Sequence, residues 1–189
     1  RHQPPVHQLA LAEEVAVGRP VAARGDHEAR RDLDAAPHLD GVARPVVLGP
    51  FDYEHSPVTT GLWVGEGRTS YFGDLLAERS GLGSPQDYLT LESRHITDLQ
   101  TKQPGRLVQT LEQSSSQMFE RIPADQKVDY YMKGPVVGLV LDAHIRRLTN
   151  GTKSMDDVIR LEYQRWSGAK GYTATEFNQT VSDAAGVDV

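Results

Sequence analysis

The stretch Gly134-Pro-Val-Val-Gly-Leu-Val-Leu-Asp-Ala-His-Ile-Arg-Arg-Leu148 decides the fold class of this chain. It is too long for a typical strand, and its apolar residues fall on more than one side of a helix. Asn150-Gly151 follows one residue later and is a pair that commonly ends a helix. The stretch therefore predicts a central buried helix, and with it a mainly α fold.

Helical patterns with start and stop signals surround this stretch. They predict helices over residues 63–79, 84–99 and 154–166, and a last helix from Thr173 onward. Ser84 precedes a proline and an acidic first turn, and Thr173 opens a capping box. Residues 103–123 are polar and contain two prolines, so a loop with about one turn of helix is expected there.

Composition excludes several classes of protein. The 189 residues carry a net charge of -6, from 20 Lys and Arg against 26 Asp and Glu, so the positive field that binds a nucleic-acid backbone is missing. No apolar run is long enough to span a membrane. The absence of Cys excludes disulfides, thiol nucleophiles and Cys-type metal sites, so any metal must be held by His, Asp or Glu.

The first 43 residues differ in composition from the rest. Residues 1–50 contain no Phe, Trp or Tyr but four of the seven His. Aromatic side chains supply much of what a core buries, so we predict a poorly ordered segment over 1–43 and a packed domain over 44–189. We hypothesise that residues before about Arg44 are read in a shifted frame or come from an unrelated upstream sequence, which resequencing of the gene would test.

Glu66 is the first candidate functional residue. It stands between two glycines in the apolar run from Gly61 to Asp74. An isolated Glu is most often a solvated surface residue, but the apolar neighbours predict burial of this helix. A buried carboxylate must be paired or bind a metal to offset its desolvation, which makes Glu66 a candidate metal ligand.

Tyr131 is the second candidate, in the segment Asp129–Gly134 directly before the predicted central helix. A tyrosine at this place can simply pack against its neighbours. Its hydroxyl can also donate a hydrogen bond to an oxyanion that develops on a peptide carbonyl, which lowers a hydrolytic barrier.

Four stretches in a fixed order carry a family resemblance: Arg44-Pro-Val-Val-Leu-Gly-Pro-Phe-Asp-Tyr-Glu54, Leu62-Trp-Val-Gly-Glu66-Gly-Arg-Thr-Ser-Tyr71, Tyr131-Met-Lys133-Gly134, and Ile145-Arg-Arg-Leu-Thr-Asn-Gly151 continued by Ser154-Met-Asp-Asp-Val158. Together they resemble the catalytic domain of the glycyl aminopeptidase family, zinc metallopeptidases of the gluzincin type. The resemblance covers residues from about Arg44 to Val189. It implies that this part is the helical subdomain of a thermolysin-like (zincin) catalytic domain.

The resemblance also implies a chemistry and roles for single residues. In the family, zinc held by two His and a Glu activates a water that attacks the peptide carbonyl. Glu66 matches the third zinc ligand, and Tyr131 matches the tyrosine that stabilises the tetrahedral intermediate. Lys133 and Gly134 are expected to shape the adjacent turn. The family has a hydrophobic residue where this chain has Arg68, a departure that is tolerated if the Arg68 side chain reaches solvent.

The His-Glu-x-x-His motif, which carries the family's first two ligands and its general base, is missing. His27-Glu28 begins the pattern, but Arg31 stands where the second His is needed. We therefore predict a zinc metallo-aminopeptidase domain for N-terminal Gly or Ala that is inactive in this polypeptide. The alternative is a non-catalytic helical remnant or a protein-interaction domain of the same fold.

The expected partner is a peptide substrate, with neither nucleic acid nor membrane involved. The acid that would bind the substrate's amino terminus is left open among Glu54, Asp74 and Glu78. Family members commonly carry a β-rich domain and a PDZ-type domain, so surfaces that contact such domains are expected. No signal peptide or membrane span is recognisable, which favours the cytoplasm.

Overall fold

The structure, a computed structural model, describes residues 43–50, 52 and 54–189. Contacts within the chain divide it into two units, Arg1–Pro37 and His38–Val189, and every described residue belongs to the second. The segment predicted to be poorly ordered, 1–43, lies outside the described residues except for Ala43. The Arg44–Glu54 stretch is described apart from residues 51 and 53.

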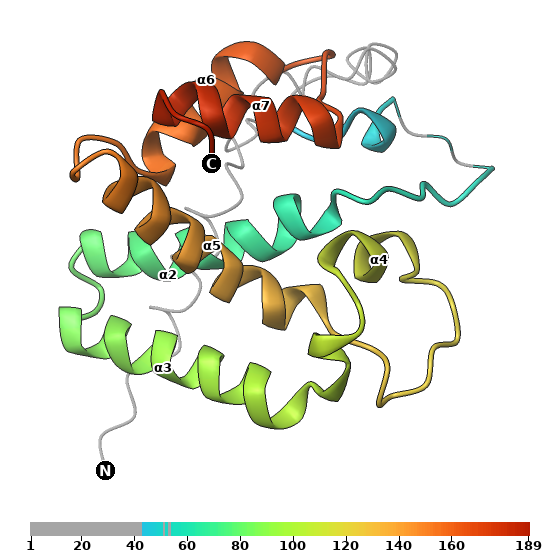
Figure 1. The fold of residues 1–189 in the computed structure, drawn as a ribbon. Coiled ribbons are helices and arrows are strands. Elements are labelled where there is room, and N and C mark those ends of the chain that lie inside the picture. The colour runs from blue at the N-terminus through green and yellow to red at the C-terminus, as the bar shows by residue number, and fades with distance from the viewer. Residues whose placement is uncertain (1–42, 51, 53) are drawn as a thin grey trace, which may run out of the picture. The chain divides into compact units, whose positions relative to one another are not determined.

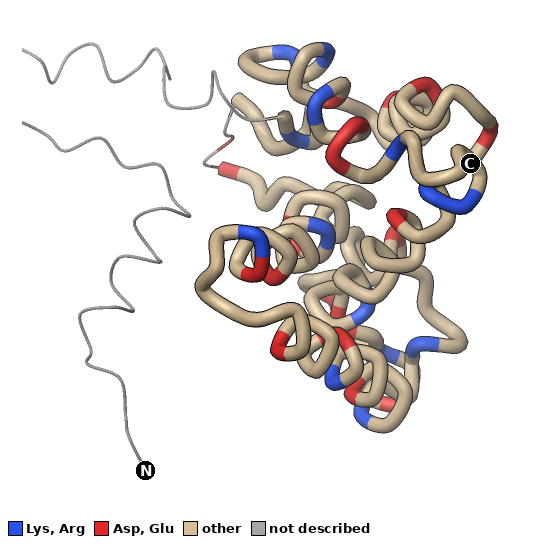
Figure 2. The backbone as a smooth tube through the Cα atoms, turned by 90° about the vertical axis from the view of Figure 1, so that its left-hand side faces the viewer, with Lys and Arg blue, Asp and Glu red and all other residues tan. Residues whose placement is uncertain are grey.

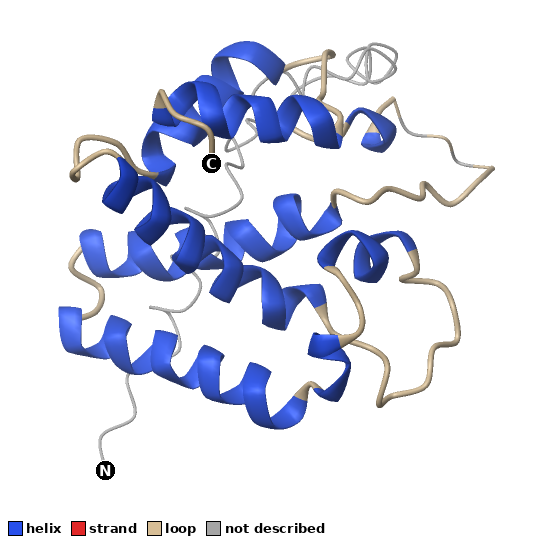
Figure 3. Cartoon of the chain, in the orientation of Figure 1, coloured by secondary structure: helices blue, strands red, loops and turns tan. Residues whose placement is uncertain are grey.

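The described part of the chain consists of helices joined by loops (Figures 1 and 3). In chain order the elements are η2 (Val46–Leu48), η3 (Trp63–Gly67), α2 (Arg68–Arg79), α3 (Pro85–Lys102), η4 (Pro104–Leu107), α4 (Leu111–Ser116), α5 (Tyr130–Leu148), α6 (Met155–Trp166) and α7 (Ala174–Ala185). Within this part the only β-type pairing is an isolated parallel bridge between Pro45 and Tyr172. The predicted mainly α fold is confirmed.

Three helices begin at the residues that the sequence marked. The side chains of Ser84 and Thr173 each accept a hydrogen bond from the backbone N–H three residues on, and that of Ser154 accepts one from the N–H two residues on. Each of the three residues closes a capping box. Such caps satisfy N–H groups that have no partner inside the helix. Because a cap uses only neighbouring residues, these boundaries could be predicted without tertiary information.

The predicted loop over 103–123 contains α4, and two of its serines are buried rather than solvated. The Ser115 hydroxyl accepts from the Trp63 N–H at 3.1 Å, and the Ser114 hydroxyl donates to the Val128 carbonyl at 2.6 Å. Thr110 caps the helix through a capping box with Gln113. The polar stretch therefore joins the start of η3 to the segment that leads into α5.

Helix α5 occupies the centre of the unit and contacts η3, α2, α3, α4 and α6. Its buried residues are few, and most of them are small or polar: Gly134, Pro135, Gly138, Asp142 and Ile145. A Cβ on Gly138 would lie 3.0 Å from the Tyr71 Cβ, so the small residue lets α2 approach closely. Helix α5 is thus the predicted central helix, but it is not covered on every side, since Val140 on the far side is 60% exposed.

Tyr71 links three helices in the core. Its ring is buried in a cluster with Ile145, Met155 and other apolar residues, and its hydroxyl donates to the Asp142 carboxylate at 3.0 Å. The same carboxylate accepts from the Met155 N–H at 2.7 Å. Burial and the charge of Asp142 raise the pKa of Tyr71, so the hydroxyl stays a donor. A hydrogen-bonded carboxylate thereby joins α2, α5 and α6.

Arg68 does not reach solvent, so the condition under which solvent would accommodate this departure from the family pattern is not met. Its guanidinium makes a two-pronged ion pair with the Glu162 carboxylate of α6, with the Nη2 to Oε1 distance at 3.0 Å. It also lies over the Phe177 ring, 5.4 Å from its centroid. An apolar residue is replaced here by a buried charge whose partner is far away in the sequence.

None of the helices in the described part combines the length and the apolarity needed to cross a bilayer. Figure 2 shows Lys and Arg interspersed with Asp and Glu along these helices.

Candidate functional site

The backbones of η3 and α5 touch at two glycines. A Cβ on Gly67 would lie 2.7 Å from the Gly134 Cα and 2.8 Å from the Tyr130 carbonyl oxygen. A Cβ on Gly134 would lie 2.5 Å from the Gly67 Cα. Any side chain at either position would force the two helices apart. The crossing brings Glu66, which precedes Gly67, next to the first turn of α5.

Glu66 lies in a π-helical turn and is exposed, so the burial expected for its carboxylate is wrong. Within η3 the buried residues are Val64 and Gly67, while Gly65 and Glu66 face outward. A π-helical turn adds a residue to the helical repeat, and such turns are frequent at functional sites. Glu66 as a metal ligand stays a prediction, and it now rests on the family resemblance and not on burial.

Tyr131 lies in the first turn of α5, which begins four residues before the predicted start at Gly134. The Asp129 side chain caps the helix by accepting from the Tyr131 N–H at 2.8 Å. Aspartate is a preferred N-cap residue, so this boundary could have been found in the sequence. The Tyr131 side chain is 47% exposed, and its ring packs 4.9 Å from that of Tyr130, centroid to centroid.

Glu66 lies close enough to Tyr131 to affect its ionisation. Partial burial, a hydrogen bond to the Glu66 carboxylate and the charge of that carboxylate raise the pKa of Tyr131 to about 12. Burial and the charges of Glu66 and Asp129 also raise the pKa of Tyr130. Both phenols therefore stay protonated near neutral pH and can donate hydrogen bonds. The structure brings the two candidates together and adds Tyr130 and Asp129, which sequence reasoning did not single out.

Lys133 shapes the neighbouring connection, although it does so from inside α5 and not in a turn. Its ammonium donates to the carbonyl oxygens of Arg106 and Gln109, each at 3.0 Å. These carbonyls belong to η4 and the residues that lead into α4. Burial lowers the pKa of Lys133, whereas the two carbonyl oxygens accept hydrogen bonds from its charged ammonium form. Lys133 thus holds the η4 segment against the first turn of α5.

Lys133→Met is expected to lower the free energy of unfolding by about 1–3 kcal/mol, because two carbonyls lose a charged donor while the apolar stem is kept. Urea unfolding followed by circular dichroism measures this. Lys127→Met, at an exposed lysine, is the control and should stay within about 0.5 kcal/mol of the parent. Equal effects of the two variants would show that the Lys133 hydrogen bonds do not hold the segment.

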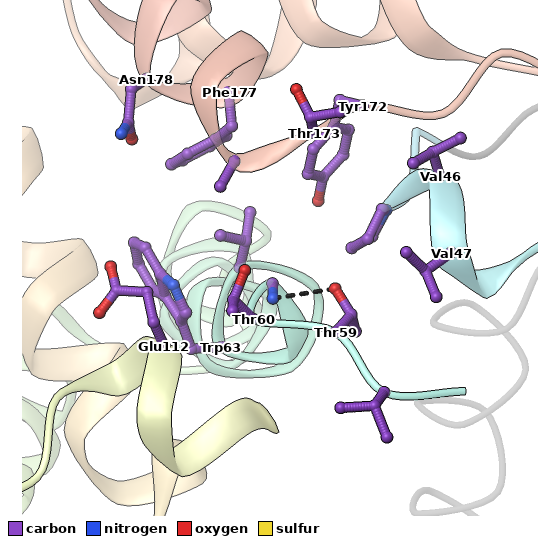
Figure 4. A pocket seen from close by; sticks show the side chains of 15 residues that line it. Val46, Val47, Thr59, Thr60, Trp63, Glu112, Tyr172, Thr173, Phe177 and Asn178 are labelled. Carbon is purple, nitrogen blue, oxygen red and sulfur yellow. Dashed lines mark hydrogen bonds between the residues drawn. The ribbon is translucent and has the colours of Figure 1, made fainter. Parts of the chain in front are cut away.

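Two pockets lie in this part of the structure, and one of them adjoins the site. One, of about 440 Å³, opens beside Tyr130 and Tyr131 and is lined by residues from the end of α3 to the start of α5. The other, of about 300 Å³, lies among Val46, Thr59, Trp63, Tyr172 and Phe177 (Figure 4). Neither Glu66 nor Tyr131 lines the second pocket. A ligand that reaches Tyr131 would therefore use the first.

The described residues supply only Glu66 of the predicted zinc ligands. No group of three ligating side chains in this part of the chain includes it. A catalytic zinc takes three protein ligands and water, so these residues by themselves do not fit the ion. Of the acids considered for binding a substrate amine, Asp74 lies two helical turns beyond Glu66 and clusters with Glu92 and His95.

Comparisons with known proteins agree with this fold. The family profile for M61 glycyl aminopeptidase matches residues 41–137, more than half of the 189-residue chain. Among solved structures, the chain is similar to an aminopeptidase N family protein from Idiomarina loihiensis, at 22% sequence identity and a TM-score of 0.64. The match covers 80% of this chain and 28% of that chain. No curated protein matches the chain significantly.

Proposed function

Because the chain belongs to the glycyl aminopeptidase family, we propose that residues 44–189 are the helical part of a zinc metallo-aminopeptidase domain that removes Gly or Ala from peptide N-termini. Membership of a peptidase family and an aminopeptidase fold support the reaction class. The preference for small residues rests on the family resemblance. This chain matches 28% of the aminopeptidase N family structure. That it shares the activity of a complete aminopeptidase is therefore part of the proposal.

The observation that carries the proposal is the proximity of Glu66 to Tyr131. The two residues come from different helices, and the Gly67–Gly134 crossing holds them together. A carboxylate able to bind a cation beside a protonated phenol suits hydrolysis of a peptide bond, because negative charge develops on the carbonyl oxygen in the transition state.

Tyr131 would act as the hydrogen-bond donor. Its hydroxyl lies near the Glu66 carboxylate, and the oxygen of a bound substrate would become its acceptor. The raised pKa keeps the proton on the phenol across the neutral range, so Tyr131 stabilises the oxyanion without ionising. The pocket beside Tyr130 and Tyr131 offers room for the substrate residue next to the carbonyl.

We further propose that this polypeptide does not hydrolyse peptides by itself. The 189 residues contain no His-Glu-x-x-His motif, and Glu66 alone cannot form a catalytic zinc centre. Binding of the peptide does not need the missing groups, because Tyr131 and its pocket lie in the described part of the chain. Peptide binding without turnover is therefore the expected behaviour.

The test adds a glycyl peptide to the ¹⁵N-labelled chain and follows backbone amide signals, together with an assay for release of glycine in the presence of zinc. Shifts are expected at Gly65–Gly67 and Tyr130–Gly134, with no turnover. Tyr131→Phe, which keeps the ring, should weaken binding by several-fold through loss of one hydrogen bond. The same peptide with an acetylated amino terminus serves as the control for recognition of the free amine.

Two outcomes would contradict the proposal. Shifts that are absent from this site, or equal for free and acetylated peptides, would favour a remnant or an interaction domain without an aminopeptidase subsite. Zinc-dependent release of glycine that disappears in Glu66→Ala would show that a complete active centre exists in this polypeptide. In that case Tyr131→Phe should lower kcat by about 10²–10³.

A further inference from the structure

Three ligating side chains meet between α2 and α3, away from Glu66. Asp74 lies on α2, and Glu92 and His95 lie one turn apart on α3. The His95 Nδ1 is 3.7 Å from the Asp74 Oδ2 and 4.0 Å from the Glu92 Oε2, and one ligand atom from each residue lies within 4.8 Å of the other two. The two helices lie side by side (Figure 1).

Glu92 is buried without a hydrogen-bond partner. Its side chain is 4% exposed, and neither of its carboxylate oxygens accepts a hydrogen bond from any described residue. The His95 Nδ1, which faces these oxygens, is also without a hydrogen bond in this part of the chain. Burying an unpaired carboxylate costs several kcal/mol, so a native protein normally supplies a partner.

The charges around Glu92 do not supply that partner. Among the described residues, neither Glu92 nor Asp74 forms an ion pair with Lys or Arg, and His95 is the only basic group within 4.0 Å of either. Burial first and then the charge of Asp74 raise the pKa of Glu92 to about 7, and burial raises that of Asp74. The ionised carboxylates of the cluster are therefore disfavoured as they stand, and a bound cation would stabilise them.

We propose that Asp74, Glu92 and His95 form a binding site for a divalent transition-metal ion of the Zn²⁺ class, which links α2 to α3. Zinc bonds of about 2.0–2.2 Å in tetrahedral geometry separate ligand atoms by about 3.3–3.6 Å. The two separations that involve His95 need to close by about 0.1–0.7 Å, and the Asp74–Glu92 separation, which is at most 4.8 Å, by up to about 1.5 Å. One imidazole and two carboxylates favour such ions over Ca²⁺ or Mg²⁺.

The site also has an entry path and an open position. The side chains of Asp74 and His95 are 25% and 24% exposed, so an ion can enter past them while Glu92 binds from the buried side. Three protein ligands leave the fourth position of a tetrahedral zinc to water. The site shares no ligand with the peptidase site, so each can be tested without the other.

The test measures zinc per chain by elemental analysis after Zn²⁺ loading and dialysis against a weak chelator. The parent should retain about one zinc, and excess Zn²⁺ should raise its Tm by roughly 5–10 °C, whereas Mg²⁺ should not. Glu92→Gln and His95→Gln should each lose the retained zinc and the Tm shift. Asp98→Asn, a change on the same helix outside the cluster, should behave as the parent.

Glu66→Ala separates this site from the peptidase site and should retain the zinc. Zinc lost in Glu66→Ala but kept in Glu92→Gln would place the ion at the peptidase site and overturn the proposal. Zinc kept by every variant would place it elsewhere, for example on the histidines of residues 1–50, and would also overturn it. A parent that retains no zinc has no such site. If Glu92→Gln does not fold, loss or retention of zinc in His95→Gln tests the site, because His95 is partly exposed and its replacement is less disruptive.

Discussion

Replacing Arg68 with Met is expected to lower the free energy of unfolding by about 3–5 kcal/mol, because it leaves the carboxylate of Glu162 buried without a counter-charge. The side chain of Glu162 is 2% exposed and that of Arg68 is 8% exposed, so water cannot replace the lost partner. The variant also loses the contact between the guanidinium and the Phe177 ring. Urea unfolding followed by circular dichroism measures the difference.

The double variant Arg68→Met with Glu162→Leu is the matched control. Removing both charges avoids the unpaired carboxylate, and apolar replacements of a buried ion pair are often neutral or stabilising. We expect the double variant to recover most of the stability lost in Arg68→Met. A cost below about 1 kcal/mol for Arg68→Met alone would contradict the interpretation that the ion pair balances a buried charge.

Replacing Gly134 with Ala is expected to cost at least about 2 kcal/mol, although Ala is the better helix former. The new Cβ would lie 2.5 Å from the Gly67 Cα, a backbone atom that can move only if the helices separate. Separation would move Glu66 away from Tyr131. The pKa of Tyr131 should therefore fall from about 12 toward its ordinary value of 10.0, which an ultraviolet titration of the tyrosines can measure.

Gly73→Ala provides the comparison within α2. A Cβ at Gly73 would meet no atom within 4 Å, so this change should stabilise the chain by about 0.5–1 kcal/mol through helix propensity. The two Gly to Ala changes are therefore expected to have opposite signs. Equal stabilisation by both would show that the η3–α5 crossing is not tight, and the Tyr131 titration would then be unchanged.

The candidate site was predictable in its residues but not in its arrangement. Glu66 and Tyr131 follow from motifs of the family, and each motif is a short local pattern. Their proximity depends on the close approach of the two backbones at Gly67 and Gly134. In the sequence these are two separate glycines, and nothing local indicates that they meet. The exposure of Glu66 was not predictable either, because apolar neighbours in a helix do not reveal which way a π-helical turn directs a carboxylate.

The same distinction applies to the fold as a whole. The sequence by itself determined the helical class and the starts of α3, α6 and α7, because capping boxes at Ser84, Ser154 and Thr173 join residues only a few positions apart. Only the tertiary structure decided that Arg68 pairs with Glu162 and that Asp74 meets His95. The physical reason is that caps satisfy backbone groups locally, whereas a buried charge is stabilised by whichever residue the packing of helices brings within a few ångströms.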